Sequence, residues 1–297
     1  MTVVALDVGG TLMKGAVIAP DGTATAVEQR PTPRQPDTVE GILRFAADLR
    51  DSAANDGAEN NGAGQPDAVG LAVPGIVDEE NGIARYSTNL GWRDLPLRDI
   101  ATRHLRLPVA LVHDVRAGAL AEARFGAAQG VQDFLFLPIG TGVAGTVFLG
   151  GQPYRGADGM AGEIGHAPVP FGDEPCACGQ RGCLETYASA AAIVRRYGQP
   201  SLSAADVIAA TDPVARKVVT DAIHALGAAL TTYTMYLDPE LIVIGGGLAE
   251  AGDTLLDPIR AELAARITWR AAPRVVKAAL GATAGRLGAA ISAWRLT

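Results

Sequence analysis

Residues 2–18, TVVALDVGGTLMKGAVI, form the segment from which the fold can be predicted. Residues 2–7 are an apolar, β-branched run typical of a buried strand, and residues 9–11 (GGT) are typical of a tight turn. Residues 15–18 are apolar again and predict a returning strand. The segment therefore predicts a β-hairpin with a glycine-rich tip.

A second segment repeats this layout further along the chain. In residues 134–149, FLFLPIGTGVAGTVFL, an apolar strand again enters a Gly/Thr-rich tip and a second strand leaves it. Between and after the two segments, strand-like runs alternate with helical periods, whereas the polar residues 55–65 predict a surface loop. The predicted helices cover residues 38–52, 117–125, 214–236 and 284–294, and the further predicted strands cover residues 67–73, 109–112 and 241–244. This alternation and repeat predict an α/β chain with two related domains that face a common cleft.

Composition excludes several classes of protein. The 297 residues, of which 48% are hydrophobic, suffice for one or two well-packed domains. A net charge of -7, without any Lys/Arg run, argues against a nucleic-acid partner. The N-terminus lacks the features of a signal peptide, and no apolar run reaches the roughly 18 residues that span a bilayer. We therefore expect a cytoplasmic protein without a membrane segment.

The glycine-rich tips are candidate phosphate-binding turns. Backbone amides can approach an anion closely only where no Cβ intervenes, and the chain carries three such tips, at Gly9-Gly10-Thr11, Gly140-Thr141-Gly142 and Gly245-Gly246-Gly247. One such tip alone would be read as an ordinary turn. Asp7, just before the first tip, is a candidate Mg²⁺ ligand. Neither GxxxxGK[ST] nor GxGxxG occurs, which argues against a Walker-type NTPase and a dinucleotide-binding fold.

All three cysteines lie in one short, glycine-containing segment. Cys176, Cys178 and Cys183 are odd in number and clustered, which in a reducing compartment favours a metal site over disulfides. Zn²⁺ takes four ligands in a tetrahedron, and His166 is the nearest candidate for the fourth. Buried apolar cysteines are the alternative. Four protein ligands would make the site structural, because no position stays open for water.

Several motifs together resemble one protein family. They are LDVGGT at residues 6–11, GTG at residues 140–142, AGEIGH at residues 161–166 and CxCGxxGCxE at residues 176–185. The chain resembles the ROK family (repressors, open reading frames and kinases) of bacterial sugar kinases over essentially its whole length, and most closely the glucokinases of that family.

The resemblance implies an actin/hexokinase-like (ribonuclease H-like) α/β fold of two domains, with ATP and sugar in the cleft between them. We expect a small domain of residues 1–112 and 284–297, and a large domain of residues 113–283 that contains the zinc loop 166–185. The resemblance also implies a homodimer.

The same resemblance assigns roles to single residues. Asp114 matches the general base, and Asn89, Glu163, His166 and Glu185 match sugar ligands, so that His166 would serve both sugar and zinc. The first two tips match phosphate-binding turns, and residues 245–247 match the turn near the adenosine. One position departs from the family: the residue before the base is usually Asn, whereas here it is His113. We expect His113 to face the sugar, although it can instead turn away and pack against Arg116 or backbone.

The expected reaction is transfer of the γ-phosphate of ATP, with Mg²⁺, to a hexose hydroxyl, with glucose 6-phosphate as the expected product. The sequence leaves other substrates open, namely N-acetylmannosamine, N-acetylglucosamine, fructose and other hexoses. It also leaves open whether polyphosphate is the phosphoryl donor and how the protein is regulated. The alternatives from another class are a non-catalytic sugar sensor and a transcriptional regulator. The second is disfavoured because a predicted strand begins at Thr2 and leaves no room for a helix-turn-helix ahead of it.

Overall fold

The computed structural model describes residues 1–60 and 65–297, and their contacts divide the chain into two compact units. Unit 1 comprises Met1–Phe125, Gly156–Met160 and Ala282–Thr297, and unit 2 comprises Gly126–Arg155 and Ala161–Gly281. Helix α3 (Asp114–Phe125) belongs to unit 1 because it packs against the C-terminal helix α9 (Ala284–Trp294). The domain boundaries expected at residues 112/113 and 283/284, and the cleft, stay predictions.

Unit 1 is built on a five-stranded sheet whose order is β3-β2-β1-β4-β8. Its strands are β1 (Val3–Val8), β2 (Leu12–Ile18), β3 (Ala24–Pro31), β4 (Ala68–Val73) and β8 (Val109–His113). Strands β1 and β2 form the predicted hairpin, in register from Val3 opposite Ile18 to Val8 opposite Met13. Since β1, β4 and β8 are parallel, their carboxyl ends lie at one edge of the sheet.

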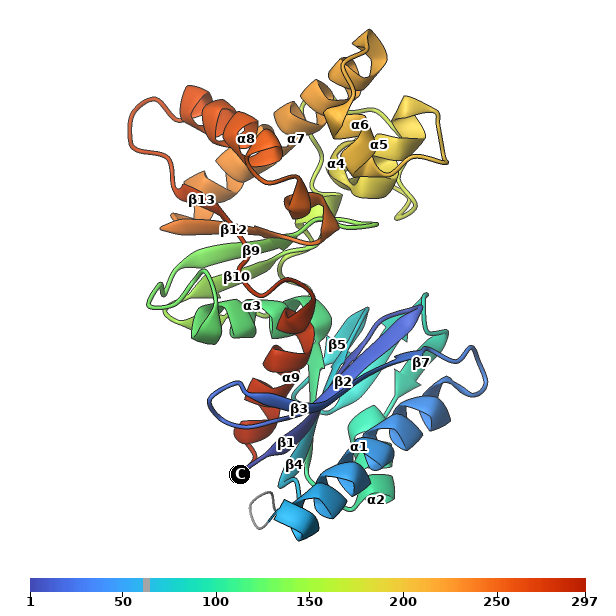
Figure 1. The fold of residues 1–297 in the computed structure, drawn as a ribbon. Coiled ribbons are helices and arrows are strands. Elements are labelled where there is room, and N and C mark those ends of the chain that lie inside the picture. The colour runs from blue at the N-terminus through green and yellow to red at the C-terminus, as the bar shows by residue number, and fades with distance from the viewer. Residues whose placement is uncertain (61–64) are drawn as a thin grey trace. The chain divides into compact units, whose positions relative to one another are not determined.

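Helices cover both faces of this sheet (Figure 1). Apolar residues of α1 (Thr38–Asn60) and α2 (Leu97–Leu105) share one core with alternate residues of β1. Helices α3 and α9 pack on the other face, where glycines permit close approach: a Cβ on Gly70 would collide with the carbonyl group of Ala289. A small sheet of β5 (Ile76–Asp78), β6 (Ile83–Ser87) and β7 (Trp92–Leu95) completes the unit.

The loop predicted for residues 55–65 is wrong over residues 55–60, which continue α1 to Asn60. The buried residues Ile42, Phe45 and Leu49 anchor the helix, and each further turn then adds a hydrogen bond per residue at little cost. A single Gly in that stretch costs only about 1 kcal/mol relative to Ala. Residues 61–64 lie outside the described residues.

Unit 2 repeats the sheet of unit 1. Its order is β11-β10-β9-β12-β13, with two antiparallel pairings followed by two parallel ones, as in unit 1. The strands are β9 (Phe134–Pro138), β10 (Thr146–Leu149), β11 (Gln152–Pro153), β12 (Leu241–Gly245) and β13 (Arg274–Lys277). The repeat predicted from the two glycine-rich tips is therefore confirmed at the level of topology.

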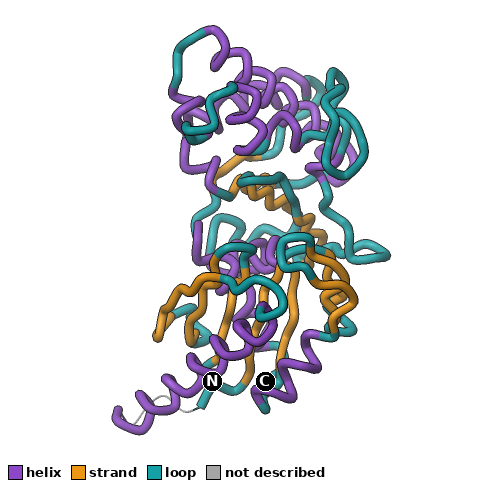
Figure 2. The backbone as a smooth tube through the Cα atoms, turned by 90° about the vertical axis from the view of Figure 1, so that its right-hand side faces the viewer, coloured by secondary structure: helices purple, strands orange, loops and turns teal. Residues whose placement is uncertain are grey.

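Helices predominate in the rest of unit 2 (Figure 2). They are α4 (Glu185–Ala188), α5 (Ala190–Tyr197), α6 (Ala204–Ala209), α7 (Pro213–Leu237) and α8 (Asp253–Arg266), with 3₁₀ turns η1 (Ile164–His166) and η2 (Gly247–Ala251). A third turn, η3 (Gly281–Thr283), spans the boundary between the two units. Helix α7 begins at Pro213 because the Asp212 side chain accepts the free amides of Val214 and Ala215. Within the described residues, every helix is too short or too polar to cross a membrane.

Candidate functional site

The tip between β1 and β2 is a closed turn that leaves two backbone amides free. Gly9 N–H donates to the carbonyl of Leu12 (3.0 Å), and the hydroxyl of Thr32 donates to the carbonyl of Gly9 (2.7 Å), which close the turn. Across the part of the chain that the structure describes, the amides of Gly10 and Thr11 donate to no protein acceptor. Two exposed amides and a hydroxyl are thus available to phosphate oxygens.

Asp7 lies beside this tip at the end of β1. Burial raises the pKa of its carboxyl, and the charges of Lys14 and Arg286 partly offset that rise. Gly285 on α9 makes room for the carboxylate, since a Cβ there would lie 2.5 Å from the Asp7 Cγ. The sequence analysis missed both cations. Lys14 lies opposite Asp7 in the predicted hairpin, so the strand pairing could have located it, whereas no local pattern shows that α9 brings Arg286 to Asp7.

Asp114 and His113 lie where β8 ends and α3 begins. Burial, followed by the nearby carboxylate of Asp7, raises the pKa of Asp114 to about 7. Its Oδ1 accepts the amide of Val115 (2.8 Å) and lies 3.3 Å from Nε2 of His113. Burial and the charge of Arg116 lower the pKa of His113 to about 3, so the imidazole is neutral. A carboxyl with a pKa near neutrality is suited to accept a proton.

A buried ion pair that the sequence analysis missed supports this junction. Arg116 Nε donates to Glu79 Oε1 (2.6 Å), and the same oxygen accepts the backbone amide of His113 (3.0 Å). The Arg116 guanidinium also donates to the carbonyls of Gly159 and Val77. Glu79 was missed because it is far from Arg116 in sequence and an acid after a short strand usually faces solvent.

Asn89 lies against the glycine-rich tip of unit 1. A Cβ on Gly10 would be 3.1 Å from the Asn89 Cβ, and the Asn89 side chain is exposed. The structure therefore brings the candidate residues of unit 1 into one group. They are Asp7, Gly9, Gly10, Thr11, Asn89, His113 and Asp114.

The second tip, between β9 and β10, presents amides in a similar way. Gly140 N–H donates to the carbonyl of Gly142 (2.9 Å), whereas the amides of Thr141 and Gly142 have no protein acceptor among the residues described. Glu185 Oε2 accepts the amide of Val143 (2.9 Å) and occupies the space that a Cβ on Gly142 would need. Glu185 therefore also holds the tip in place.

The turn after β12 lies next to this second tip. Because β9 and β12 are parallel neighbours, their carboxyl ends meet, and Ile139 exchanges backbone hydrogen bonds with Gly245 and Leu248. Gly246 adopts a φ of 76°, and a Cβ there would collide with the backbone of Ile139. Residues 140–142 and 245–247 thus form one edge of the sheet.

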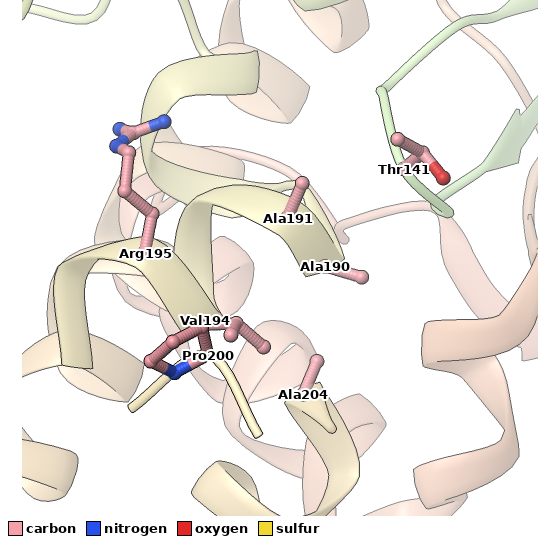
Figure 3. Close-up of a pocket in the computed structure, with 7 residues that line it drawn as sticks. All are labelled: Thr141, Ala190, Ala191, Val194, Arg195, Pro200 and Ala204. Carbon is pink, nitrogen blue, oxygen red and sulfur yellow. The ribbon is translucent and has the colours of Figure 1, made fainter. Parts of the chain in front are cut away.

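A pocket of about 520 Å³ opens beside the same tip (Figure 3). Thr141 lies on one side, and the other side consists mainly of small apolar side chains of α5 and α6. The lining residues are Thr141, Ala190, Ala191, Val194, Arg195, Pro200 and Ala204. Apart from Thr141, the sequence analysis missed these residues, because alanines at helical spacing are usual in any packed helix.

The four predicted metal ligands form a cluster. One donor atom from each of His166, Cys176, Cys178 and Cys183 lies within 4.8 Å of the others. The Cys178 and Cys183 sulfurs are 3.7 Å apart, as are Cys176 Sγ and His166 Nδ1. Thiolates bound at 2.3 Å in a tetrahedron are about 3.8 Å apart, so this donor set fits Zn²⁺.

Glu163 immediately precedes the short turn η1, and His166 is its last residue. His166 directs Nδ1 towards the sulfurs, which leaves its Nε2 on the other side of the ring. Glu163 is exposed, and its charge adds to burial in raising the pKa of Tyr233. Unit 2 thus carries two glycine-rich turns, the cluster of His166 with three cysteines, Glu163 and Glu185. The meeting of these groups with those of unit 1 stays a prediction.

Comparison with known proteins places the whole chain in one family. The model of the ROK family matches residues 3–295. The chain is 36% identical over 314 aligned positions to the glucokinase of Halalkalibacterium halodurans, covering 96% of this chain and 92% of the relative.

Solved structures with the same fold include an enzyme and a regulator. A ROK family glucokinase from Streptomyces griseus, in complex with glucose and AMPPNP, matches with a TM-score of 0.82 at 30% identity, over 99% of this chain and all of the other. A ROK family transcriptional regulator matches with a TM-score of 0.86 at 25% identity, over 98% of this chain and 77% of the other. The fold is therefore shared by both classes, and the site must decide between them.

Proposed function

The chain belongs to the ROK family, and from this membership we propose that it is an ATP-dependent hexose kinase that converts glucose to glucose 6-phosphate. Its actin/hexokinase-like two-domain fold agrees with this function. The observation that carries the proposal is Asp114, a carboxyl with a pKa of about 7 beside a turn with free amides. A regulator or sensor that only binds sugar needs no such base.

In this proposal Asp114 takes the proton of the attacking hydroxyl. Asn89 in unit 1, and Glu163, His166 and Glu185 in unit 2, are the proposed hydroxyl ligands of the sugar. The His166 ring can bind both Zn²⁺ and the sugar, because Nδ1 faces the cysteine sulfurs and Nε2 does not. Fixing the hydroxyl and the phosphate in line supplies most of the catalysis in phosphoryl transfer.

The phosphates are assigned to the glycine-rich tips at residues 9–11 and 140–142, whose amides are free to donate. The apolar pocket between Thr141 and α5 suits the adenine ring. Residues 245–247, which adjoin residues 140–142 at the same edge of the sheet, are assigned to the adenosine. Asp7 is the proposed Mg²⁺ ligand, and the ion would neutralise charge on the phosphates. Zn²⁺ on His166 and the three cysteines would keep the loop folded.

A coupled assay of ADP release with a panel of hexoses tests the function. With ATP and Mg²⁺ we expect turnover of glucose to exceed that of mannose, fructose and the N-acetylhexosamines, and a parallel series with polyphosphate identifies the donor. Asp114→Asn keeps the shape and removes the base, so turnover should fall by about 10²- to 10⁴-fold. Absence of ADP release from wild-type protein with every sugar, despite sugar binding, would support a sensor or regulator instead.

A further inference from the structure

The two carboxylate oxygens of Asp114 have different surroundings. Asp114 is the first residue of α3, and its Oδ1 turns back to accept the free amide of Val115 at 2.8 Å. His113 Nε2 lies 3.3 Å from the same oxygen. Within the described residues no donor is recorded on Oδ2. One oxygen is therefore held by the protein, and the other is available.

The imidazole of His113 carries one proton, and its surroundings indicate which nitrogen holds it. The ring is neutral because burial and the Arg116 charge both oppose protonation. Nδ1 is buried and has no hydrogen-bond partner. A proton on Nδ1 would leave a buried donor unsatisfied and turn the Nε2 lone pair towards a carboxylate oxygen, which is repulsive. The proton is therefore better placed on Nε2.

We propose that His113 is a positioning residue whose Nε2–H donates to Oδ1 of Asp114, so that Oδ2 is the oxygen that receives the proton of the sugar hydroxyl. This inference rests on the proposed role of Asp114 as the base. The separation of 3.3 Å is long for a hydrogen bond, as is common before substrate is bound, and a small rotation of the ring shortens it. This role takes the place of the sugar contact expected for His113, because Nε2 then donates to Asp114 and Nδ1 is buried.

The reaction step then has a defined path for the proton. The sugar oxygen forms a bond to the γ-phosphorus, the bond from that phosphorus to the β–γ bridging oxygen breaks, and ADP leaves with that electron pair. The hydroxyl proton moves to Oδ2 of Asp114 and is later released to water. A donor fixed on Oδ1 keeps the carboxylate from rotating away from this path.

The backbone of His113 is itself anchored. Glu79 Oε1 accepts its amide at 3.0 Å and is paired with the Arg116 guanidinium. The charged groups around His113 and Asp114 are thus Asp7 from β1, Glu79 after β5, and Arg116 from α3. Removal of the His113 donor would leave these charges in place, so that its effect can be measured by itself.

Substitution of His113 by glutamine or asparagine tests which ring nitrogen makes the hydrogen bond to Asp114. A Gln amide nitrogen reaches roughly as far as Nε2, whereas an Asn amide nitrogen reaches only as far as Nδ1. A hydrogen bond to a carboxylate favours its ionised form, so loss of the donor raises the pKa of Asp114 further. For His113→Asn we expect the acid limb of kcat/KM for glucose to move up by about one pH unit, and kcat/KM at pH 6 to fall about tenfold.

For His113→Gln we expect the acid limb of the kcat/KM profile to lie near that of wild type, close to pH 7. The exposed His104 on α2 supplies matched controls, and neither His104→Asn nor His104→Gln should move the profile. Identical pH profiles for wild type, His113→Asn and His113→Gln would overturn the positioning role. If instead Asp114→Asn keeps normal turnover, the proposed base is wrong and the function fails separately.

A measurement on the wild-type protein covers the case in which a variant does not fold. The ¹⁵N shifts of the His113 ring in histidine-labelled protein report which nitrogen is protonated, and His104→Gln helps to assign the four histidine signals. A neutral ring protonated on Nε2 is expected between pH 6 and 8. A proton on Nδ1, or a ring that titrates in this range, would overturn the proposal.

Discussion

At Asp114 the environment that suits the carboxyl to catalysis also opposes its ionisation. Burial and the neighbouring Asp7 raise the pKa of Asp114 to about 7, although 34% of its side-chain surface is accessible. The folded chain therefore binds this proton more tightly than the unfolded chain does. Its contribution to stability is present at pH values below the ordinary carboxyl pKa and is lost as the pH rises through about 7.

Asp114→Asn, the variant expected to lower turnover, should consequently stabilise the protein at alkaline pH. An amide carries no charge to bury or to repel Asp7, so we expect a free energy of unfolding about 1 kcal/mol higher than that of wild type at pH 8, a value reduced for solvent screening. The gain should vanish near pH 4. Urea unfolding of both proteins at the two pH values measures it, and an equal or lower stability of the variant at pH 8 would contradict the raised pKa.

At the scale of elements, the carboxyl ends of parallel strands gather the site residues. Strand β1 ends beside Asp7, and β8 ends at His113, with β4 between them in the sheet. The Glu79–Arg116 pair fixes the end of β8, and its side chains are only 8% and 4% exposed.

Glu79→Gln should destabilise unit 1, because it leaves the Arg116 charge buried without its counterion. Breaking a buried pair from one side costs about 3–5 kcal/mol. The exposed pair Glu40–Arg44 on α1 is a matched control, and Glu40→Gln should cost less than about 1 kcal/mol. Urea unfolding monitored by tryptophan fluorescence compares the two. Equal effects would show that the Glu79 pair contributes no more than a surface pair.

The loop around the four proposed metal ligands has little core of its own. Residues 170–182 contain few buried side chains, so that four ligands supply most of the constraint. We expect one Zn²⁺ per chain in purified protein by elemental analysis. Removal of the Zn²⁺ with a chelator should lower both the activity and the Tm, and added Zn²⁺ should restore both. Full activity with well below one zinc per chain would contradict this.

At the scale of the whole molecule, unit 1 is assembled from both ends of the chain. Helix α9 buries Leu287, Ala289 and Ile291 and contacts β1, β4 and β8, whereas unit 2 is continuous from residue 126 to residue 281 apart from Gly156–Met160.

Deletion of residues 282–297 should therefore unfold unit 1 and leave unit 2 folded. Limited proteolysis of the shortened chain should yield a protected fragment close to residues 126–281, while deletion of the exposed residues 295–297 should change little. Loss of protection over the whole chain would show that the two units do not fold independently.

The sequence by itself determined the alternation of strands and helices, the two hairpins and the cluster of three cysteines with His166. These features depend on contacts between residues that are close along the chain: period-2 apolar runs, glycines that permit tight turns, and three thiols within one loop. The candidate residues at the ends of β-strands could be predicted for the same reason, since Asp7 and Asp114 each lie at the end of an apolar strand.

Tertiary structure decided what surrounds those residues. Arg286 near Asp7, Glu79 bound to the amide of His113, and the pocket between Thr141 and α5 each combine segments far apart in the chain. The raised pKa of Asp114 and the neutral ring of His113 follow from burial, which no local pattern reports. Local sequence specifies which groups are present, but desolvation and charge depend on every element packed around them, and so the chemistry of the site is a property of the folded chain.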